Sequence, residues 1–371
     1  MNGGPEPGRD QKPVSVGLVG ARGHGLHHRR RLTAQHDSGL IRWVAVCDVV
    51  PVDDVPDGVA AFTDHREMLR AVRPDIVIVC TPPHTHTAIA VDCLQAGADV
   101  LLEKPPVLTL AEHETLLATA ERTGRSLQIG FQALGSAALP LLHEAIDAGR
   151  LGEIRAVSAF GSWQRDDAYW ARSSWSGRRG IDGALANPFA HALMQCIAVL
   201  RPPKVAKVEV ERLRARPIEV DDTAAVRATF EDGSQIVVAV TLCGEDFLPG
   251  EVVVHGSTGT AHLEYPTDRL CLPGAEERVL LDQRTDLLLN LAAHRADPGI
   301  PLVAPLAATA TFTAMLEHIR DAPEPYDIAP DRLVRQGGAV VVSGINHTVR
   351  EAAFRLALLS DIDPQLTKDH R

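Results

Sequence analysis

Lysine is scarce in this chain of 371 residues, which has five lysines against thirty-two arginines. Since arginine supplies most of the positive charge, a lysine inside an apolar stretch needs an explanation. Lys104 ends the run that starts at Ala98, and Pro105 and Pro106 follow it. An ammonium is a compact donor whose pKa shifts readily, and prolines end a strand because they cannot donate a ladder hydrogen bond. We interpret Lys104 as a site residue at the carboxyl end of a buried strand; the plain alternative is a lysine that flanks a turn.

The chain also has no paired cysteine spacing and no apolar run of membrane-spanning length, and residues 1–12 do not show the apolar core expected of a signal peptide. The six cysteines show no paired spacing, so we expect reduced thiols and a cytoplasmic protein. Residues 1–12 contain glycine, proline and charge, and we expect them to form a disordered arm. The formal net charge of −11 argues against nucleic acid, although residues 27–31 are basic, and we interpret that run as a solvated helix face.

A glycine cluster follows the first apolar stretch. Residues 14–25 read as a strand that enters a glycine loop, and a helical stretch follows at about 26–36. This order is typical of dinucleotide binding, where a tight turn and helix amides hold a pyrophosphate. The fingerprint is imperfect, because Arg22 replaces its middle glycine; the arginine must turn aside or pair with the phosphates itself. We expect cofactor contacts from Gly20, Arg22, Gly23, His24 and Gly25.

A second strand, residues 42–47, ends at Asp48. An acidic residue at this distance beyond the loop accepts hydrogen bonds from the adenosine ribose. Because no arginine directly follows it to accept a 2′-phosphate, the sequence favours NAD over NADP. A third apolar run, residues 75–80, breaks at the turn that contains Thr81, Pro82, His84 and His86, before a helix at about 88–95. We interpret that turn as a cofactor loop; a metal pair of the two histidines is the weaker alternative, because no third ligand has suitable spacing.

Strands and helices that alternate at short intervals predict a doubly wound parallel sheet in residues 13–133. The glycine loop, Asp48, the Thr81-Pro82 turn with His86, the segment Glu103-Lys104-Pro105 and Gly130-Phe131-Gln132 together resemble the glucose-fructose oxidoreductase, inositol dehydrogenase and rhizopine-catabolism family, Gfo/Idh/MocA. The resemblance covers most of the chain. It implies a Rossmann domain and, for residues 134–371, an α/β domain on a large, open, mainly antiparallel sheet. It also adds Glu103, Lys104 and Gln132 to the expected cofactor contacts.

The resemblance further implies a helix with an aspartate and, four residues later, a histidine that takes the substrate proton. His191 matches the histidine, whereas Asn187 occupies the aspartate position. An amide cannot supply the charge that makes a neighbouring imidazole more basic, although it can orient a substrate. Lys104 would donate to the reacting oxygen, His191 would act as general base, and Asn187 would assist them. A plainer role for Asn187 is a helix N-cap before Pro188, and for His191 a core histidine.

Aromatic residues are few, yet three of the four tryptophans lie between residues 160 and 180 with arginines among them. Rings that stack on a sugar face and charged groups that satisfy its hydroxyls suggest a carbohydrate or polyol pocket. The candidate substrate contacts are Lys104, Trp163, Trp170, Arg172, Trp175, Asn187 and His191. The alternative is that the tryptophans cover one sheet face while the arginines face solvent.

Alternating segments at 205–213, 224–230, 235–241 and 251–255 predict the antiparallel sheet of the second domain. Helical patterns follow at about 286–295, 307–320 and 347–359. We expect these helices to cover one sheet face and to leave the other face for a partner subunit in a homodimer or homotetramer.

These observations favour an NAD-dependent oxidoreductase that transfers a hydride to or from a secondary alcohol or ketone of a sugar, sugar derivative or cyclitol. Two alternatives stay open: an NAD-retaining enzyme of the same fold that cleaves glycosides, and a non-catalytic sensor of dinucleotide and sugar. The pattern indicates no metal.

Overall fold

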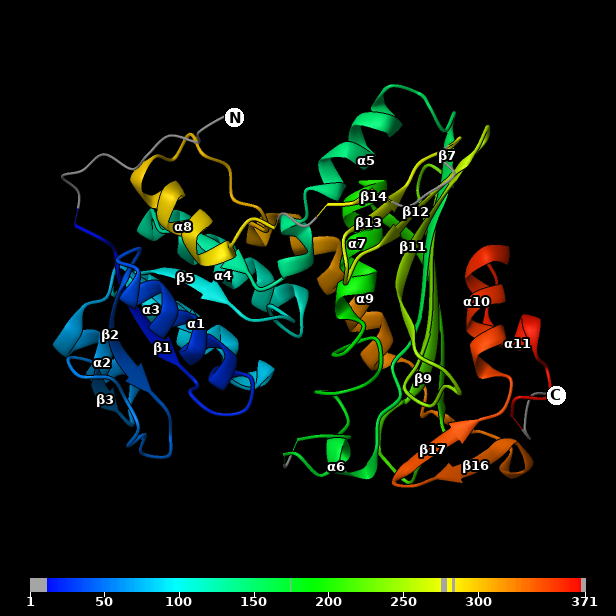
Figure 1. The fold of residues 1–371 in the computed structure, drawn as a ribbon, viewed down its shortest axis with the longest axis horizontal. Helices are drawn as coiled ribbons and strands as arrows, with labels where there is room; N and C mark the ends of the chain where they lie inside the picture. Colours follow the sequence, from blue (N-terminus) through cyan, green and yellow to red (C-terminus); the bar gives the residue numbers. More distant parts are fainter. Residues whose placement is uncertain (1–11, 174, 275–278, 282–283, 368–371) are drawn as a thin grey trace. The chain divides into compact units, whose positions relative to one another are not determined.

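A computed structural model describes residues 12–173, 175–274, 279–281 and 284–367. The chain divides into two compact units, each discontinuous in sequence (Figure 1). The first unit contains residues 1–103, 115–128 and 288–302, and the second contains 104–114, 129–287 and 303–371. Lys104 is therefore the first residue of the second unit. The disordered arm predicted for residues 1–12 lies outside the described residues, except for Lys12.

A six-stranded sheet forms the centre of the first unit, in the order β3-β2-β1-β4-β5-β6. The recorded pairings from β3 to β5 are all parallel. The strands are β1 (Ser15–Val19), β2 (Arg42–Cys47), β3 (Ala60–Phe62), β4 (Ile76–Val79), β5 (Asp99–Leu102) and β6 (Leu127–Ile129). Every residue of β1, β4 and β5 is buried, as expected for parallel strands covered on both faces. The strand order is that of a doubly wound nucleotide-binding sheet, which confirms the predicted fold class.

Helices complete this unit, and all of them except the last lie between its strands in sequence. They are α1 (Gly25–Asp37), α2 (His65–Val72), α3 (His86–Gln95), α4 (Leu110–Thr123) and the later α8 (Leu287–Ala296), with the 3₁₀ turn η1 (Pro83–Thr85) before α3. The sequence predicted α1, α3 and α8 to within two residues at each end. It missed α2 and α4. Helix α2 begins where the Asp64 side chain accepts hydrogen bonds from the amides of Arg66 and Glu67.

The second unit is built on a nine-stranded sheet, in the order β14-β13-β12-β11-β7-β10-β9-β8-β15. Its strands are β7 (Ile154–Ser162), β8 (Val205–Arg214), β9 (Thr223–Phe230), β10 (Gln235–Thr241), β11 (Leu248–Gly256), β12 (Thr260–Glu264), β13 (Arg269–Cys271), β14 (Val279–Leu280) and β15 (Tyr326–Asp327). The pairs β7–β10 and β8–β15 are parallel, and the others are antiparallel. The sheet is thus mainly antiparallel, as predicted. Its central strand β7 was not predicted.

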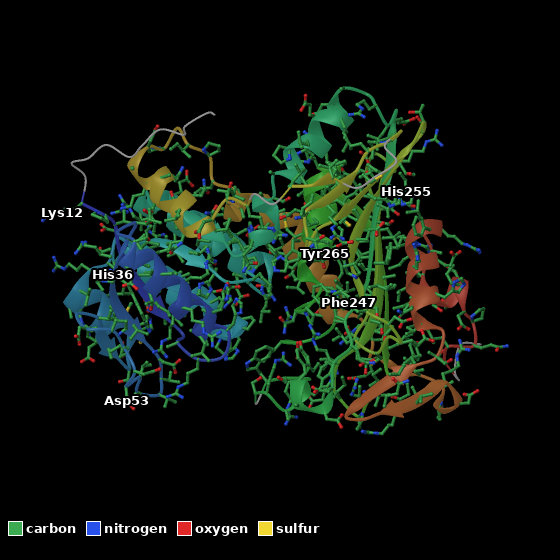
Figure 2. All side chains as sticks on the ribbon, in the orientation of Figure 1. Lys12, His36, Asp53, Phe247, His255 and Tyr265 are labelled. Carbon is green, nitrogen blue, oxygen red and sulfur yellow. The ribbon has the colours of Figure 1, made fainter. Side chains whose placement is uncertain are left out.

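Helices pack on both faces of this sheet, which corrects the expectation that they cover only one (Figure 1). The helices α5 (Ala138–Asp147), α7 (Ala190–Leu200) and α9 (Ala310–Asp321) lie on one face, and α10 (Ile345–Arg355) lies on the other. Tyr265, labelled in Figure 2, follows β12 and is buried near Cys196 of α7. The remaining short elements are η2 (Gln132–Gly135), α6 (Asp167–Trp170), η3 (Leu306–Thr309), η4 (Pro330–Arg332), the hairpin of β16 (Leu333–Gln336) and β17 (Ala339–Val342), and α11 (Leu359–Ile362).

Among the described residues, no helix has the length and apolar character needed to cross a membrane.

Candidate active site

The glycine loop of the first unit has a backbone that only glycine fits at two positions. Gly20 has φ +91°, and a Cβ there would lie 2.2 Å from the carbonyl oxygen of Cys80. A Cβ on Gly25 would lie 2.1 Å from the carbonyl oxygen of Gly20. The loop therefore folds back tightly over the ends of β1 and β4 before α1 begins, as a phosphate-binding turn requires.

Arg22 and its neighbours occupy the exposed part of this loop. The Arg22 guanidinium donates to the carbonyl oxygen of Pro51 at 3.0 Å, so the side chain turns aside toward the loop after β2. Gly23 has φ +56°, and His24 is the exposed N-cap residue of α1. The first turn of α1 contains no acidic residue that would oppose an anion at its amino end.

Asp48 fixes the loop to the end of β2. Its Oδ2 accepts a hydrogen bond from the Ala21 amide at 2.8 Å, and its Oδ1 accepts one from the Val50 amide at 3.2 Å. The residue is partly exposed, and a carboxylate has about four acceptor positions, so it retains capacity for ribose hydroxyls. The residues at this edge of the sheet thus fit a dinucleotide.

The other predicted cofactor residues of the first unit differ in exposure. Thr81 and Pro82 are partly exposed in the turn after β4, where Thr85 Oγ1 donates to Thr81 Oγ1 at 2.7 Å. His86 is fully buried, and its Nε2 lies 2.8 Å from the carbonyl oxygen of Thr81. The ring therefore holds the shape of the turn. Glu103 is also buried, against His28 and His24.

Lys104 of the second unit binds the segment that contains Asn187. Its Nζ donates to Asn187 Oδ1 at 2.8 Å and to the Asn187 carbonyl oxygen at 3.0 Å. The two residues are 83 positions apart in sequence and both are partly buried. The sequence placed both in the catalytic group, and the structure brings these two together.

A carboxylate that the sequence analysis missed lies behind Asn187. Asp182 Oδ1 accepts a hydrogen bond from Asn187 Nδ2 at 3.0 Å, and its Oδ2 accepts one from the Gly177 amide at 2.9 Å. Asp182 is 6% exposed, and Arg172 NH2 lies 3.7 Å from its Oδ2. The only available signal was its position five residues before Asn187. The family resemblance implies a carboxylate at position 187. In this chain the carboxylate belongs to Asp182, which is hydrogen-bonded to Asn187.

A buried ion pair supports the turn that leads to Asn187. Asp221 Oδ2 accepts from the Ala184 amide at 2.9 Å, while Arg212 Nε donates to Asp221 Oδ1 at 2.8 Å. Both side chains of the pair are almost inaccessible to solvent. A buried, hydrogen-bonded pair of this kind constrains backbone position more than it adds stability.

His191 lies in the first turn of α7. The helix begins at Ala190 with Phe189 as its N-cap residue, so the interpretation of Asn187 as N-cap is wrong. The Asn187 side chain instead binds Lys104 and Asp182, and residues 184–189 form turns. The partly buried His191 ring meets Phe131 edge to face, with 5.7 Å between centroids. Gln132, next to Phe131, is partly buried at the start of η2.

The aromatic residues near residue 170 form two groups, which Arg165 connects by lying over the rings of Trp163 and Tyr169. Trp163 stacks on Phe189, just before α7, at 4.3 Å between centroids. The Arg172 guanidinium lies 3.6 Å from the centre of the Tyr169 ring and 5.0 Å from that of Trp175. The first group therefore adjoins α7, and the second is connected through Arg172 to Asp182. Trp170 contacts Tyr169 edge to face at 5.3 Å.

Two family models match the chain. Residues 14–131 match an oxidoreductase family with an NAD-binding Rossmann fold, and residues 141–262 match the GFO/IDH/MocA C-terminal domain. Together they cover more than half of the sequence. The chain belongs to the Gfo/Idh/MocA oxidoreductase family, which confirms the resemblance, the enzyme class and NAD as the family cofactor.

Relatives with established names are moderately similar. The rhizopine catabolism protein MocA of Rhizobium meliloti is 29% identical over 259 residues, which are 67% of this chain and 78% of MocA. D-glucoside 3-dehydrogenase of Escherichia coli is 32% identical over 153 residues, 40% of this chain and 43% of that enzyme. The similarity to the second enzyme thus spans less than half of its length.

Solved structures show the same fold at lower identity. The WlbA dehydrogenase of Bordetella pertussis, solved with NADH and UDP-GlcNAcA, has a TM-score of 0.70 at 23% identity and covers 83% of this chain and 95% of its own. An inositol dehydrogenase homologue of Azotobacter vinelandii, solved with NADH and myo-inositol, has a TM-score of 0.69 at 20% identity and covers 84% and 97%. At these identities the likeness concerns the fold alone.

Proposed function

We propose that this protein is an NAD-dependent oxidoreductase acting on a secondary alcohol or ketone of a sugar, sugar derivative or cyclitol. The observation that carries the proposal is the pair of hydrogen bonds from Lys104 Nζ to Asn187, four residues before His191. A fixed ammonium and an imidazole supplied by adjoining segments are the groups that alcohol oxidation requires from the protein.

Each residue has a distinct task in this proposal. Bound NAD would supply the hydride acceptor at the nicotinamide C4. Lys104 would donate a hydrogen bond to the reacting oxygen and stabilise its alkoxide character. His191 would accept the hydroxyl proton as general base. Asn187 would keep the ammonium in place while its amide nitrogen is held by Asp182.

The substrate class rests on the aromatic and charged residues around residue 170 and on the relatives. Arg172 packs between Tyr169 and Trp175 and faces Asp182, a combination of flat apolar surface and polar anchors that suits a polyol. The relatives named above include a D-glucoside 3-dehydrogenase and an inositol dehydrogenase homologue. We also propose a homodimer or homotetramer, as the family resemblance implies.

The test is to mix the protein with NAD and a panel of glucosides, inositols and nucleotide sugars while following NADH absorbance at 340 nm. NADH formed in proportion to substrate supports the proposal. Cleavage of a glycoside without accumulation of NADH would instead identify the NAD-retaining enzyme. Binding of NAD and a sugar, measured by calorimetry, without conversion of either would identify the sensor.

A further inference from the structure

Two histidines and a glutamate of the first unit converge at the amino end of α1, and two of them, His24 and Glu103, also belong to the expected cofactor contacts. His24 lies at the start of α1, His28 lies one turn later, and Glu103 follows β5. His28 Nε2 lies 2.8 Å from Glu103 Oε1, and His24 Nε2 lies 3.5 Å from the same oxygen. The three ligand atoms all lie within 4.8 Å of one another. We propose that these side chains form a binding site for a transition-metal ion of the Zn²⁺ class.

The backbone gives the two imidazoles a suitable arrangement. His24 has φ −64° and ψ −26°, so it continues the helical path into α1. Residues four apart on a helix project from the same face, and two histidines with this spacing are a common zinc-binding pair. The imidazole edges in this pair point to one carboxylate oxygen, as the two short separations show.

The separations are close to those of a tetrahedral site. Zinc binds imidazole nitrogen at about 2.0–2.1 Å and carboxylate oxygen at about 2.0–2.2 Å, which places neighbouring ligand atoms about 3.4 Å apart. The separation between His24 Nε2 and Glu103 Oε1 is 3.5 Å, close to this value, whereas that between His28 Nε2 and Glu103 Oε1 is 2.8 Å, about 0.6 Å shorter. The ion would therefore replace the close contact between His28 and Glu103, and the exposed His24 side chain would turn to complete the site.

The three proposed ligands differ in burial. Glu103 is 6% exposed and His28 is 4% exposed, whereas the His24 side chain is 54% exposed. Two ligands are thus fixed in the protein interior, and the third closes over the ion from the solvent side.

Three protein ligands leave the fourth tetrahedral position open, so a water molecule or a ligand atom would complete the site. Imidazole with a single carboxylate suits zinc, copper and nickel, whereas magnesium and calcium prefer sites made of oxygen. The site should therefore discriminate Zn²⁺ from Mg²⁺.

The experiment uses tag-free, full-length protein freed of metal by dialysis against a chelator. Calorimetric titration with Zn²⁺ alone should show one site, and Mg²⁺ should show none. Titration with Co²⁺ should produce the intense visible absorption of a four-coordinate ion. Because His24 is exposed, His24→Ala should fold normally and weaken Zn²⁺ binding at least tenfold.

A neighbouring histidine provides the matched control. His27 is exposed on the same turn and stacks on His24 at 5.6 Å, but it is not part of the three-ligand group. His27→Ala should bind Zn²⁺ as the natural protein does. Glu103→Gln should lose binding, and its thermal unfolding without metal shows whether it has folded. Equal affinity in His24→Ala and His27→Ala, or no Zn²⁺ binding by the natural protein, would overturn the proposal.

Discussion

Asn187 presents its amide oxygen to Lys104 Nζ at 2.8 Å and its amide nitrogen to Asp182 Oδ1 at 3.0 Å. The chemistry of the neighbours determines this orientation, because an ammonium can only donate and a carboxylate only accept. The reversed amide would place donor against donor and acceptor against acceptor. Asn187 therefore connects the buried carboxylate of Asp182 to the ammonium of Lys104 through two hydrogen bonds. It occupies the position where the family resemblance implies an aspartate.

Replacement of Lys104 by alanine tests its proposed catalytic role. The variant removes the donor to the reacting oxygen, so kcat/KM should fall by about 10²–10⁴-fold, while NAD affinity should change little. The measurements are steady-state kinetics and calorimetric titration with NAD. Lys204→Ala, which removes an exposed lysine, is the control and should keep full activity. Undiminished turnover in Lys104→Ala would remove this lysine from the mechanism.

Replacement of Asn187 by aspartate tests the hydrogen-bond relay. It restores the family residue beside Lys104 but places two carboxylates about 3 Å apart, where like charges disfavour joint ionisation. The free energy of unfolding at neutral pH should fall by about 1–3 kcal/mol. Asp182→Asn in the same chain should recover most of this loss, because the double variant again pairs one carboxylate with one amide. Additive losses in urea unfolding would show that the two positions do not interact.

Local patterns were enough to predict the central parallel strands of the first unit and the positions of four strands of the second. Strand β4 has four consecutive buried β-branched residues, and the turn signals after β9 define a hairpin. Strand β7 was missed because its neighbours come from distant segments, β10 in parallel and β11 in antiparallel pairing. A central strand of this kind has no local turn to mark it.

The candidate site could also be predicted only in part, because some of its contacts join segments that are distant in sequence. Lys104 was proposed from its place at the end of an apolar run, and Asn187 and His191 were proposed from the family resemblance. Asp182 was not, because a buried acceptor in an irregular loop has no periodicity and is recognised only when its donor is placed. The contact between Arg22 and the loop after β2 could not be predicted either, because the two partners are 29 residues apart in sequence.

Cofactor preference follows from Asp48. A carboxylate that accepts from ribose hydroxyls repels a 2′-phosphate, so NAD should bind more tightly than NADP. Asp48→Ala should weaken NAD binding by about ten- to a hundredfold, the usual cost of hydrogen bonds to a charged group, and reduce the preference. Asp48→Asn keeps an acceptor for the Ala21 amide and separates the loop contact from the ribose contact. Fluorescence titrations that give the reverse order of affinities would show that Asp48 is misassigned.

Asp222 makes stability depend on pH in a defined window. Burial raises the pKa of this carboxyl to about 6, although it accepts hydrogen bonds from the Ala215 amide and lies near Arg216. The folded state therefore holds the proton more tightly than the unfolded state, in which this carboxyl has its ordinary pKa of 3.8. The contribution of this group to the free energy of unfolding is complete below about pH 4. It falls by up to about 3 kcal/mol as the pH rises from about 4 to 6, and it is absent at higher pH.

The variant Asp222→Asn isolates that contribution, because an amide does not titrate. Its free energy of unfolding relative to the natural chain should rise as the pH increases from 4 to 6 and then stay constant. Urea unfolding at several pH values measures the difference. Asp232→Asn is a suitable control, because Ser234 lowers the pKa of exposed Asp232, so its stabilisation is present at high pH and lost on acidification. A difference for Asp222→Asn that does not vary across the window would mean that this carboxyl is ionised throughout.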